Sequence, residues 1–378
     1  MRDSQDKKPA APRPAKLPER KRSFLEAIRE RMAVPGQDLA VFYNEMAFLY
    51  HAGIPLSRAI GILARQAVNA RLREVLTKLQ RHVESGHSLT DAMRLHPDVF
   101  SSLYITLIHT GEVSGTMETM LNRAAALKEK EITLSRRIGQ AATYPLFIFF
   151  FMLLFILVMG RLLILNIVPL LKSGGTKLPL LTHMLIFIYG VISNPLIVCI
   201  AILTVLFLCL KYRKAMEREG PRLLRDRILY SVPLLGGLLK TIAFSRLCST
   251  LSTLTDSGVS MLAALILAGE ASGSALCLSY CRELRQSVAG GGFLHDGFNA
   301  FDFFSPMVRD MVRVGEESGT LPYLLAQAAR LMEIQVDHAL TVFTAALEPL
   351  MMAFLGIVVA LLAFGVLVPL NGVVSSIS

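Results

Sequence analysis

Residues 109–121 read HTGEVSGTMETML, and residues 313–325 read RVGEESGTLPYLL. The likeness extends outward from this pair. On the N-terminal side, AGIPLSRAIGILARQA at 52–67 echoes SGVSMLAALILAGEAS at 257–272, again with an offset near 200 residues. Self-similarity at a constant offset is typical of proteins built from repeated units. The chain is therefore predicted to contain two copies of one structural unit.

The repeated Gly-Glu-x-Ser-Gly-Thr has the chemistry of a junction between two helices. Glycine readily ends a helix, and Ser or Thr caps the next one. The simplest interpretation is a tight turn that both copies share because they share a fold. The alternative is a corner that docks a partner or binds a cation through its carboxylates. The candidate residues are Gly111, Glu112 and Gly115 in the first copy and Gly315, Glu316 and Gly319 in the second.

Three long apolar runs point to a membrane. The chain has 378 residues, of which 53% are hydrophobic and only 18% charged, and its mean hydropathy is +0.51. A helix needs about 20 apolar residues to cross about 30 Å of hydrocarbon. Residues 144–171, 182–210 and 347–371 meet this length, if Arg161 reaches the membrane interface with its long side chain. These runs predict three transmembrane helices and exclude an ordinary cytosolic enzyme.

Apolar residues outside these runs recur at helical spacings. Phe42, Met46 and Leu49 follow one another at intervals of three or four, as on one face of a helix. No strand-like alternation of useful length occurs. The predicted fold class is an all-α membrane protein with two repeated cytoplasmic helical bundles, at 36–143 and 211–346. Each bundle is expected to contain five to six helices, and the three transmembrane helices complete the fold.

Basic residues set the predicted orientation. Arg136 and Arg137 precede the first apolar run and Lys211 follows the second, and basic residues near span ends favour the cytoplasmic side. Both bundles and the N-terminus are therefore expected in the cytoplasm. The same reasoning predicts a short periplasmic hairpin at 172–181 and a periplasmic C-terminal tail at 372–378.

Residues 1–35 combine prolines with many Lys and Arg and are predicted to form a disordered basic tail. The net charge of the whole chain is +10. Two interpretations of the tail remain open, attraction to anionic lipid or docking to an acidic cytoplasmic partner. Binding to nucleic acid is not expected, because no recognisable nucleic-acid module accompanies the charge.

Motifs for catalysis and cofactors are absent from the sequence. It contains no phosphate-binding GxxxxGK[ST] loop, no HExxH and no GxSxG. Cys277 and Cys281 stand four residues apart, but buried thiols are the better interpretation because no histidine cluster accompanies them. We expect no enzymatic activity and no cofactor, and leave a structural divalent cation unassigned.

The apolar runs begin with related junctions. Thr143-Tyr144-Pro145 opens the first run, and Ala346-Leu-Glu348-Pro349 opens the last. Together with the two-copy layout and the two GExSGT turns, these junctions resemble the inner-membrane platform proteins of type II secretion and type IV pilus machines, the GspF/PilC (T2SF domain) family. The resemblance runs from about residue 38 to residue 372.

The resemblance implies a role in assembly. Members of this family work with a cytoplasmic hexameric ATPase and other inner-membrane components, help to extract pilin or pseudopilin subunits from the membrane, and associate with themselves. The expected location is the bacterial inner membrane. The alternative from another class is a transporter or channel subunit, which would need polar residues along its spans. The three runs offer little beyond Arg161, Asn166 and Asn194.

Overall fold

The computed structural model describes residues 34–162, a few isolated positions between 189 and 204, and residues 219–233, 235–299 and 304–377. Over these residues the chain is helical and contains no strand. The predicted all-helical fold with an internal repeat is therefore confirmed. The predicted tail, hairpin and second span lie almost wholly outside the described residues.

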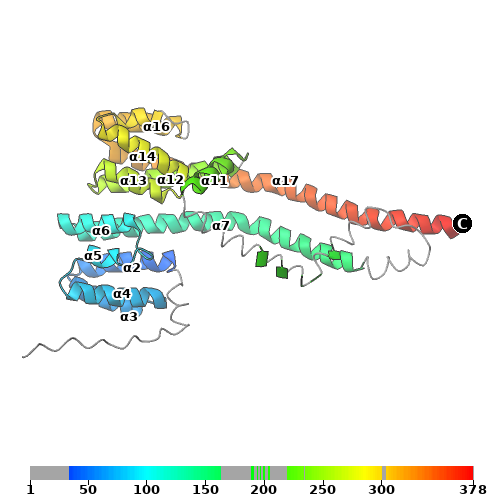
Figure 1. Cartoon of the computed structure of the whole chain (residues 1–378), viewed down its shortest axis with the longest axis horizontal. Coiled ribbons are helices and arrows are strands. Elements are labelled where there is room, and N and C mark those ends of the chain that lie inside the picture. The colour runs from blue at the N-terminus through cyan, green and yellow to red at the C-terminus, as the bar shows by residue number, and fades with distance from the viewer. Residues whose placement is uncertain are drawn as a thin grey trace, which may run out of the picture.

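Five short helices and the start of a long one form the first bundle (Figure 1). They are α2 (Gly36–His51), α3 (Leu56–Gln66), α4 (Ala70–Glu84), α5 (Leu89–Arg94), α6 (Ser102–Ser114) and α7 (Met117–Leu162).

The second bundle repeats this order after one additional helix, α11 (Glu219–Ser231). The repeated helices are α12 (Leu235–Asp256), α13 (Met261–Ala271), α14 (Ala275–Ala289), α15 (Leu294–Asn299), α16 (Pro306–Ser318) and α17 (Leu321–Ile377). The helix α3 and its counterpart α13 start 205 residues apart, whereas α6 and α16 start 204 residues apart. The stretch of sequence between α15 and α16 is therefore one residue shorter than that between α5 and α6.

The additional helix α11 is fastened to α14 by one buried carboxylate. Asp226 is almost fully buried, and its Oδ2 accepts hydrogen bonds from the backbone N–H of Ala275 at 2.7 Å and from the hydroxyl of Ser274 at 3.0 Å. A carboxylate at a helix N-terminus satisfies free backbone donors and interacts favourably with the helix dipole. Arg225 lies beside the other oxygen at 2.6 Å.

One continuous apolar core joins the two bundles. Its largest fully buried side chains include Tyr43 and Phe100 in the first copy and Phe298 and Phe304 in the second. A separate small cluster lies where α7, α12 and α17 meet, and its buried members are Leu238, Ile242, Val336 and Leu340. The two copies are therefore packed against each other.

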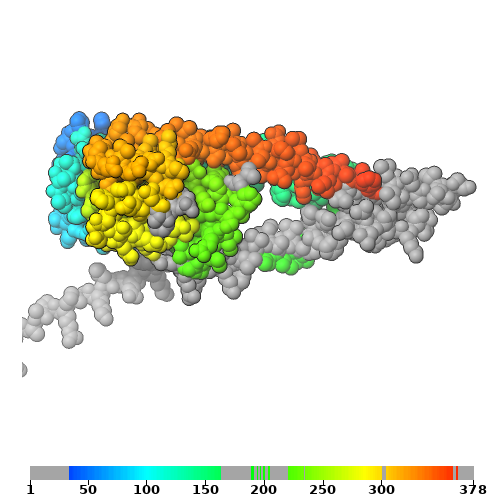
Figure 2. Space-filling view, turned by 90° about the horizontal axis from the view of Figure 1, so that it is seen from above, coloured from blue at the N-terminus to red at the C-terminus, as the bar shows by residue number. Residues whose placement is uncertain are grey.

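The last helix of each bundle continues as a long apolar rod. Helix α7 has 46 residues and α17 has 57, which corresponds to about 69 and 86 Å at about 1.5 Å per residue. Both rods leave the bundles in the same direction (Figure 1), and Figure 2 shows α17 extending away from the bundles. Their distal halves expose large apolar side chains, among them Phe147, Phe150, Phe354 and Ile357. Such a surface suits lipid better than water.

The described residues contain two helices that are long and apolar enough to cross a membrane, within Met117–Leu162 and Leu321–Ala360. They correspond to the first and third predicted spans. The span predicted at 182–210 is described only at isolated positions. One of them, Tyr189, lies close to the first span, because a Cβ added to Gly160 would come within 2.6 Å of the Tyr189 ring.

Candidate functional site

The two GExSGT turns have the same geometry. Helix α6 ends at Ser114 and α16 ends at Ser318, and the following glycines, Gly115 and Gly319, adopt left-handed backbone angles with φ of 71° and 69°. Only glycine takes this conformation without steric cost. The predicted helix–turn–helix junction is confirmed in both copies.

The first glycine of the motif has another role. Gly111 and Gly315 lie inside their helices, where the chain doubles back closely on itself. A Cβ added to Gly111 would lie 3.0 Å from the Cα of Met117, and one added to Gly315 would lie 2.9 Å from the Cα of Leu321. The motif therefore uses one glycine for close packing of two helices and the other for the turn.

The motif glutamate of the first copy points into its own bundle. Oε1 of Glu112 accepts a hydrogen bond from the backbone N–H of Leu89 at 2.6 Å, and Oε2 accepts one from the N–H of Thr90 at 3.2 Å. The hydroxyl of Thr90 also donates to Oε2. These donors belong to the first two residues of α5, so Glu112 anchors the N-terminus of that short helix.

Glu316 does the same for α15 in the second copy. Its Oε1 accepts from the backbone N–H of Leu294 at 2.7 Å, and its Oε2 accepts from the N–H of His295 at 3.0 Å and lies 2.7 Å from Nδ1 of His295. Burial alone raises the pKa of Glu316. The backbone donors and the His295 side chain outweigh that effect, so its pKa lies below the usual value.

Both carboxylates are thus engaged inside the fold. The side chain of Glu316 is 24% exposed. The described residues contain no group of three or more His, Cys, Asp or Glu side chains arranged to hold a metal ion. Docking of a partner or a cation at these corners stays a prediction.

The predicted membrane junctions lie far from the turns. Tyr144 and Pro145 are inside α7, and Glu348 and Pro349 are inside α17, and neither helix is interrupted there. From Gly115 to Pro145 the chain rises about 45 Å at about 1.5 Å per residue. The turns and the junctions are therefore separate features that one rod connects in each copy.

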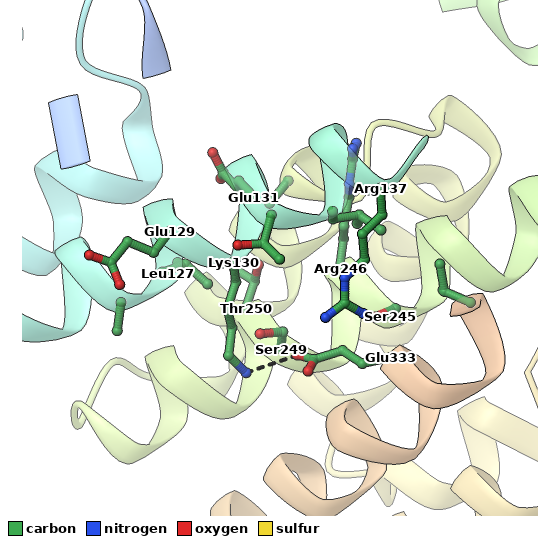
Figure 3. Close-up of a pocket in the computed structure, with 15 residues that line it drawn as sticks. Leu127, Glu129, Lys130, Glu131, Arg137, Ser245, Arg246, Ser249, Thr250 and Glu333 are labelled. Carbon is green, nitrogen blue, oxygen red and sulfur yellow. Dashed lines mark hydrogen bonds and ion pairs between the residues drawn. The ribbon is translucent and has the colours of Figure 1, made fainter. Parts of the chain in front are cut away.

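The sequence did not indicate the cavity that lies between the copies. It has a volume of about 350 Å³ and is bordered by α7 on one side and by α12 and α17 on the other (Figure 3). Its lining includes Lys130 and Arg137 from α7, and Ser249 and Thr250 from α12. Lys130 reaches across to Glu333, with 2.9 Å between Nζ and Oε1.

Three ion pairs join the copies along this interface, and α7 supplies the cation of each. They are Arg123 with Asp256 at 2.5 Å, Lys130 with Glu333 at 2.9 Å, and Arg137 with Asp337. The three cations are seven residues apart, which places them on one side of the helix. This spacing was the signal in the sequence, but its acidic partners could be recognised only in the folded chain.

A membrane protein built from two packed helical repeats, each ending in an apolar rod, is the class that this fold defines. Residues 42–164 and 247–369 both match the family described as type II secretion system (T2SS), protein F. The matches cover more than half of the chain, and they coincide with the two structural repeats. The chain belongs to this family.

Relatives are similar over nearly the whole chain. The type IV pilus assembly protein PilC of Thermus thermophilus is 33% identical over 91% of this chain and 84% of its own length. The protein of the same name from Pseudomonas aeruginosa is 30% identical, over 89% of this chain and 90% of its own length. The type II secretion system protein F of Pseudomonas aeruginosa is 28% identical, over 88% of this chain and 82% of its own length.

Proposed function

We propose that the chain is an inner-membrane platform protein that couples a cytoplasmic assembly ATPase to the extraction and polymerisation of pilin-like subunits. The observation that carries the proposal is the double family match, in which each repeat includes both a bundle and its apolar rod. Relatives that are similar along nearly their whole length take part in pilus assembly or type II secretion by name.

The proposed role is that of a scaffold without chemistry of its own. ATP is hydrolysed by the partner, and the platform transmits the motion to the membrane. The rods suit this task because α7 and α17 run from the bundles into the apolar segments as uninterrupted helices. A displacement of a bundle is carried along a continuous helix more directly than through a loop.

The proposed topology places both bundles in the cytoplasm and the C-terminus in the periplasm. Arg136 and Arg137 lie on α7 about two and a half turns before Pro145, where the apolar side chains begin. Basic residues at this level favour the cytoplasmic side.

Between the two machines, the pilus is the first to test. The relatives named for pilus assembly are 30–33% identical to this chain, whereas those named protein F of the secretion system are 26–28% identical.

An in-frame deletion tests the proposal. Surface pili are counted by electron microscopy, and proteins in the medium are compared in parallel, with the wild-type copy restored on a plasmid as control. We expect pili to be lost and to return with the plasmid, while secretion continues. Loss of secretion alone would assign the chain to the other machine. Retention of both in a strain without a second copy of the family would contradict the proposal.

A further inference from the structure

The two copies contact each other through different faces. The first copy contributes mainly α7, whose side chains pack against α12 and α17 of the second copy, and α6 adds contacts with α13. Arg123 contacts both Asp256 and Ser257 at one end of this interface. At the other end, Leu134 and Ile138 pack against the small apolar cluster to which α12 contributes Leu238 and Ile242. Helices α7 and α12 are therefore antiparallel across it. An interface between unlike faces leaves one face of each copy unused.

The unused face of the first copy lies on α2. The cavity lining on α12 includes Arg246, Ser249 and Thr250, and Thr250 is only 3% exposed. Thr253 is one turn further along the same side of α12, towards Ser257, which Arg123 contacts. The counterparts of these four α12 positions, 205 residues earlier, are Val41, Asn44, Glu45 and Phe48, which we call the α2 face. All four are exposed, and Phe48 is exposed by 71%. The same helix side is covered in one copy and open in the other.

The unused face of the second copy lies on α17, on a different side from Glu333 and Val336, which face α7. The α7 residues that pack toward the second copy include Leu127, which is 4% exposed, and Lys130, Leu134 and Ile138. Their counterparts 204 residues later are Leu331, Ile334, His338 and Val342, which with Arg330 form what we call the α17 face. Ile334 is 65% exposed, and Val342 is exposed as well.

We propose that the α17 face of one chain docks on the α2 face of a second copy of the same chain and repeats the interface found within each chain. The occupant follows from the structure, because the chain already contains a matched example of these two faces in contact. We take α17 to dock on α2 of the second copy in the same register in which α7 lies on α12 within one chain. Arg330 then comes close to Phe48 and Glu45 of the second copy, and Ile334 comes close to its Val41. The docked faces thus bring together a cation and an anion and two apolar side chains.

The direction of the rods makes such an assembly compatible with one membrane. Helices α7 and α17 point the same way (Figure 1), so the rotation that relates the copies has its axis roughly along the rods. A neighbouring chain placed by the same operation keeps its rods parallel to the first pair. Repetition then produces a ring or an arc in the membrane plane, as expected for contacts between unlike faces.

Two aspartate substitutions test the interface, each on one face only. Full-length Phe48→Asp and Ile334→Asp chains are purified in detergent, and their masses are measured by analytical ultracentrifugation. Wild-type chains are expected to form dimers or larger species. Each variant alone is expected to associate at least about tenfold more weakly, because it buries an unpaired charge in a contact between apolar side chains.

Mixing the two variants distinguishes this interface from a symmetric one. The α17 face of Phe48→Asp and the α2 face of Ile334→Asp are both intact, so the mixture is expected to form heterodimers and nothing larger. Leu95→Asp, at an exposed position outside both faces, is the matched control and should behave as wild type.

Wild-type chains that stay monomeric, variants that associate as well as wild type, or a mixture without heterodimers would each overturn the proposal. Circular dichroism of each variant confirms that it is folded before the masses are compared. The measurement requires no pilus or secretion assay, so its outcome is independent of the proposed function.

Discussion

The glutamate of the second turn provides the sharpest test of the fold, because its partners are the first backbone amides of a single short helix. Replacing Glu316 by Ala removes a charged acceptor from the N–H groups of Leu294 and His295. A hydrogen bond to a charged group contributes about 1.5–3 kcal/mol, and the helix dipole adds about 0.3–1 kcal/mol. In the variant, water takes over part of the lost hydrogen bonding, so we expect α15 to be destabilised by about 2–3 kcal/mol.

Amide hydrogen exchange measures the stability of each helix separately, so it can detect a destabilisation of α15 alone. At about 1.4 kcal/mol per factor of ten, the amides of α15 should exchange at least about 30-fold faster in Glu316→Ala, while those of α5 are unchanged. Glu316→Gln keeps an acceptor oxygen but loses the charge, and its effect should be smaller. Glu317→Gln changes the exposed neighbour and serves as the matched control.

The effect depends on pH with a definite sign. The pKa of Glu316 is lowered in the fold from a usual value of 4.5, so its stabilisation is fully present above that value and is lost as the pH falls through the folded pKa. The difference between wild type and Glu316→Gln should therefore shrink below about pH 4.5. Equal exchange in wild type, Glu316→Ala and Glu317→Gln at neutral pH would refute the anchoring role.

Three further perturbations follow from the packing. Gly315→Ala should lower the unfolding temperature, since its Cβ would clash with backbone at a cost of about 1–3 kcal/mol, whereas Gly237→Ala, with open space around it, should be neutral or slightly stabilising. Gly160→Val should destabilise the detergent-solubilised protein by clashing with the ring of Tyr189, and Tyr189→Ala should relieve that clash in the double variant. Arg123→Ala removes the part-buried cation between the copies and should lower the unfolding temperature measurably, with a smaller effect at high salt.

The sequence predicted the features that depend on local chemistry. The repeat, the turn at Gly115 and Gly319, and two of the apolar rods all follow from residue types at short spacings. The rods were predicted as segments that begin at Tyr144 and at residue 347, yet each is the continuation of a bundle helix. Hydropathy locates the apolar part of a helix, but it does not show where the helix itself begins.

The inward direction of Glu112 and Glu316 could not be predicted. A glutamate beside a turn looks like an exposed side chain available to a partner, and only the fold brings α5 and α15 to it from 22 or 23 residues away along the chain. The packing role of Gly111 was even harder to predict from the sequence, because it depends on the distance between two helix backbones. Contacts between elements remote in sequence leave little trace in a single chain.

The contact between the copies could not be predicted from the sequence for a related reason. Arg123, Lys130 and Arg137 resemble the ordinary solvated face of a helix. Their partners on α12 and α17 are remote in sequence, up to 203 residues away, and nothing local identifies them.

Recruitment of the assembly ATPase tests the central claim most directly. Membranes and cytosol from the wild-type and deletion strains are separated by sedimentation, and the ATPase is quantified in each fraction by immunoblot. A platform predicts that the ATPase sediments with wild-type membranes, moves to the cytosol in the deletion strain, and returns to the membrane when the full chain is restored. An ATPase that remains on the membrane in equal amount without the chain would contradict a platform role.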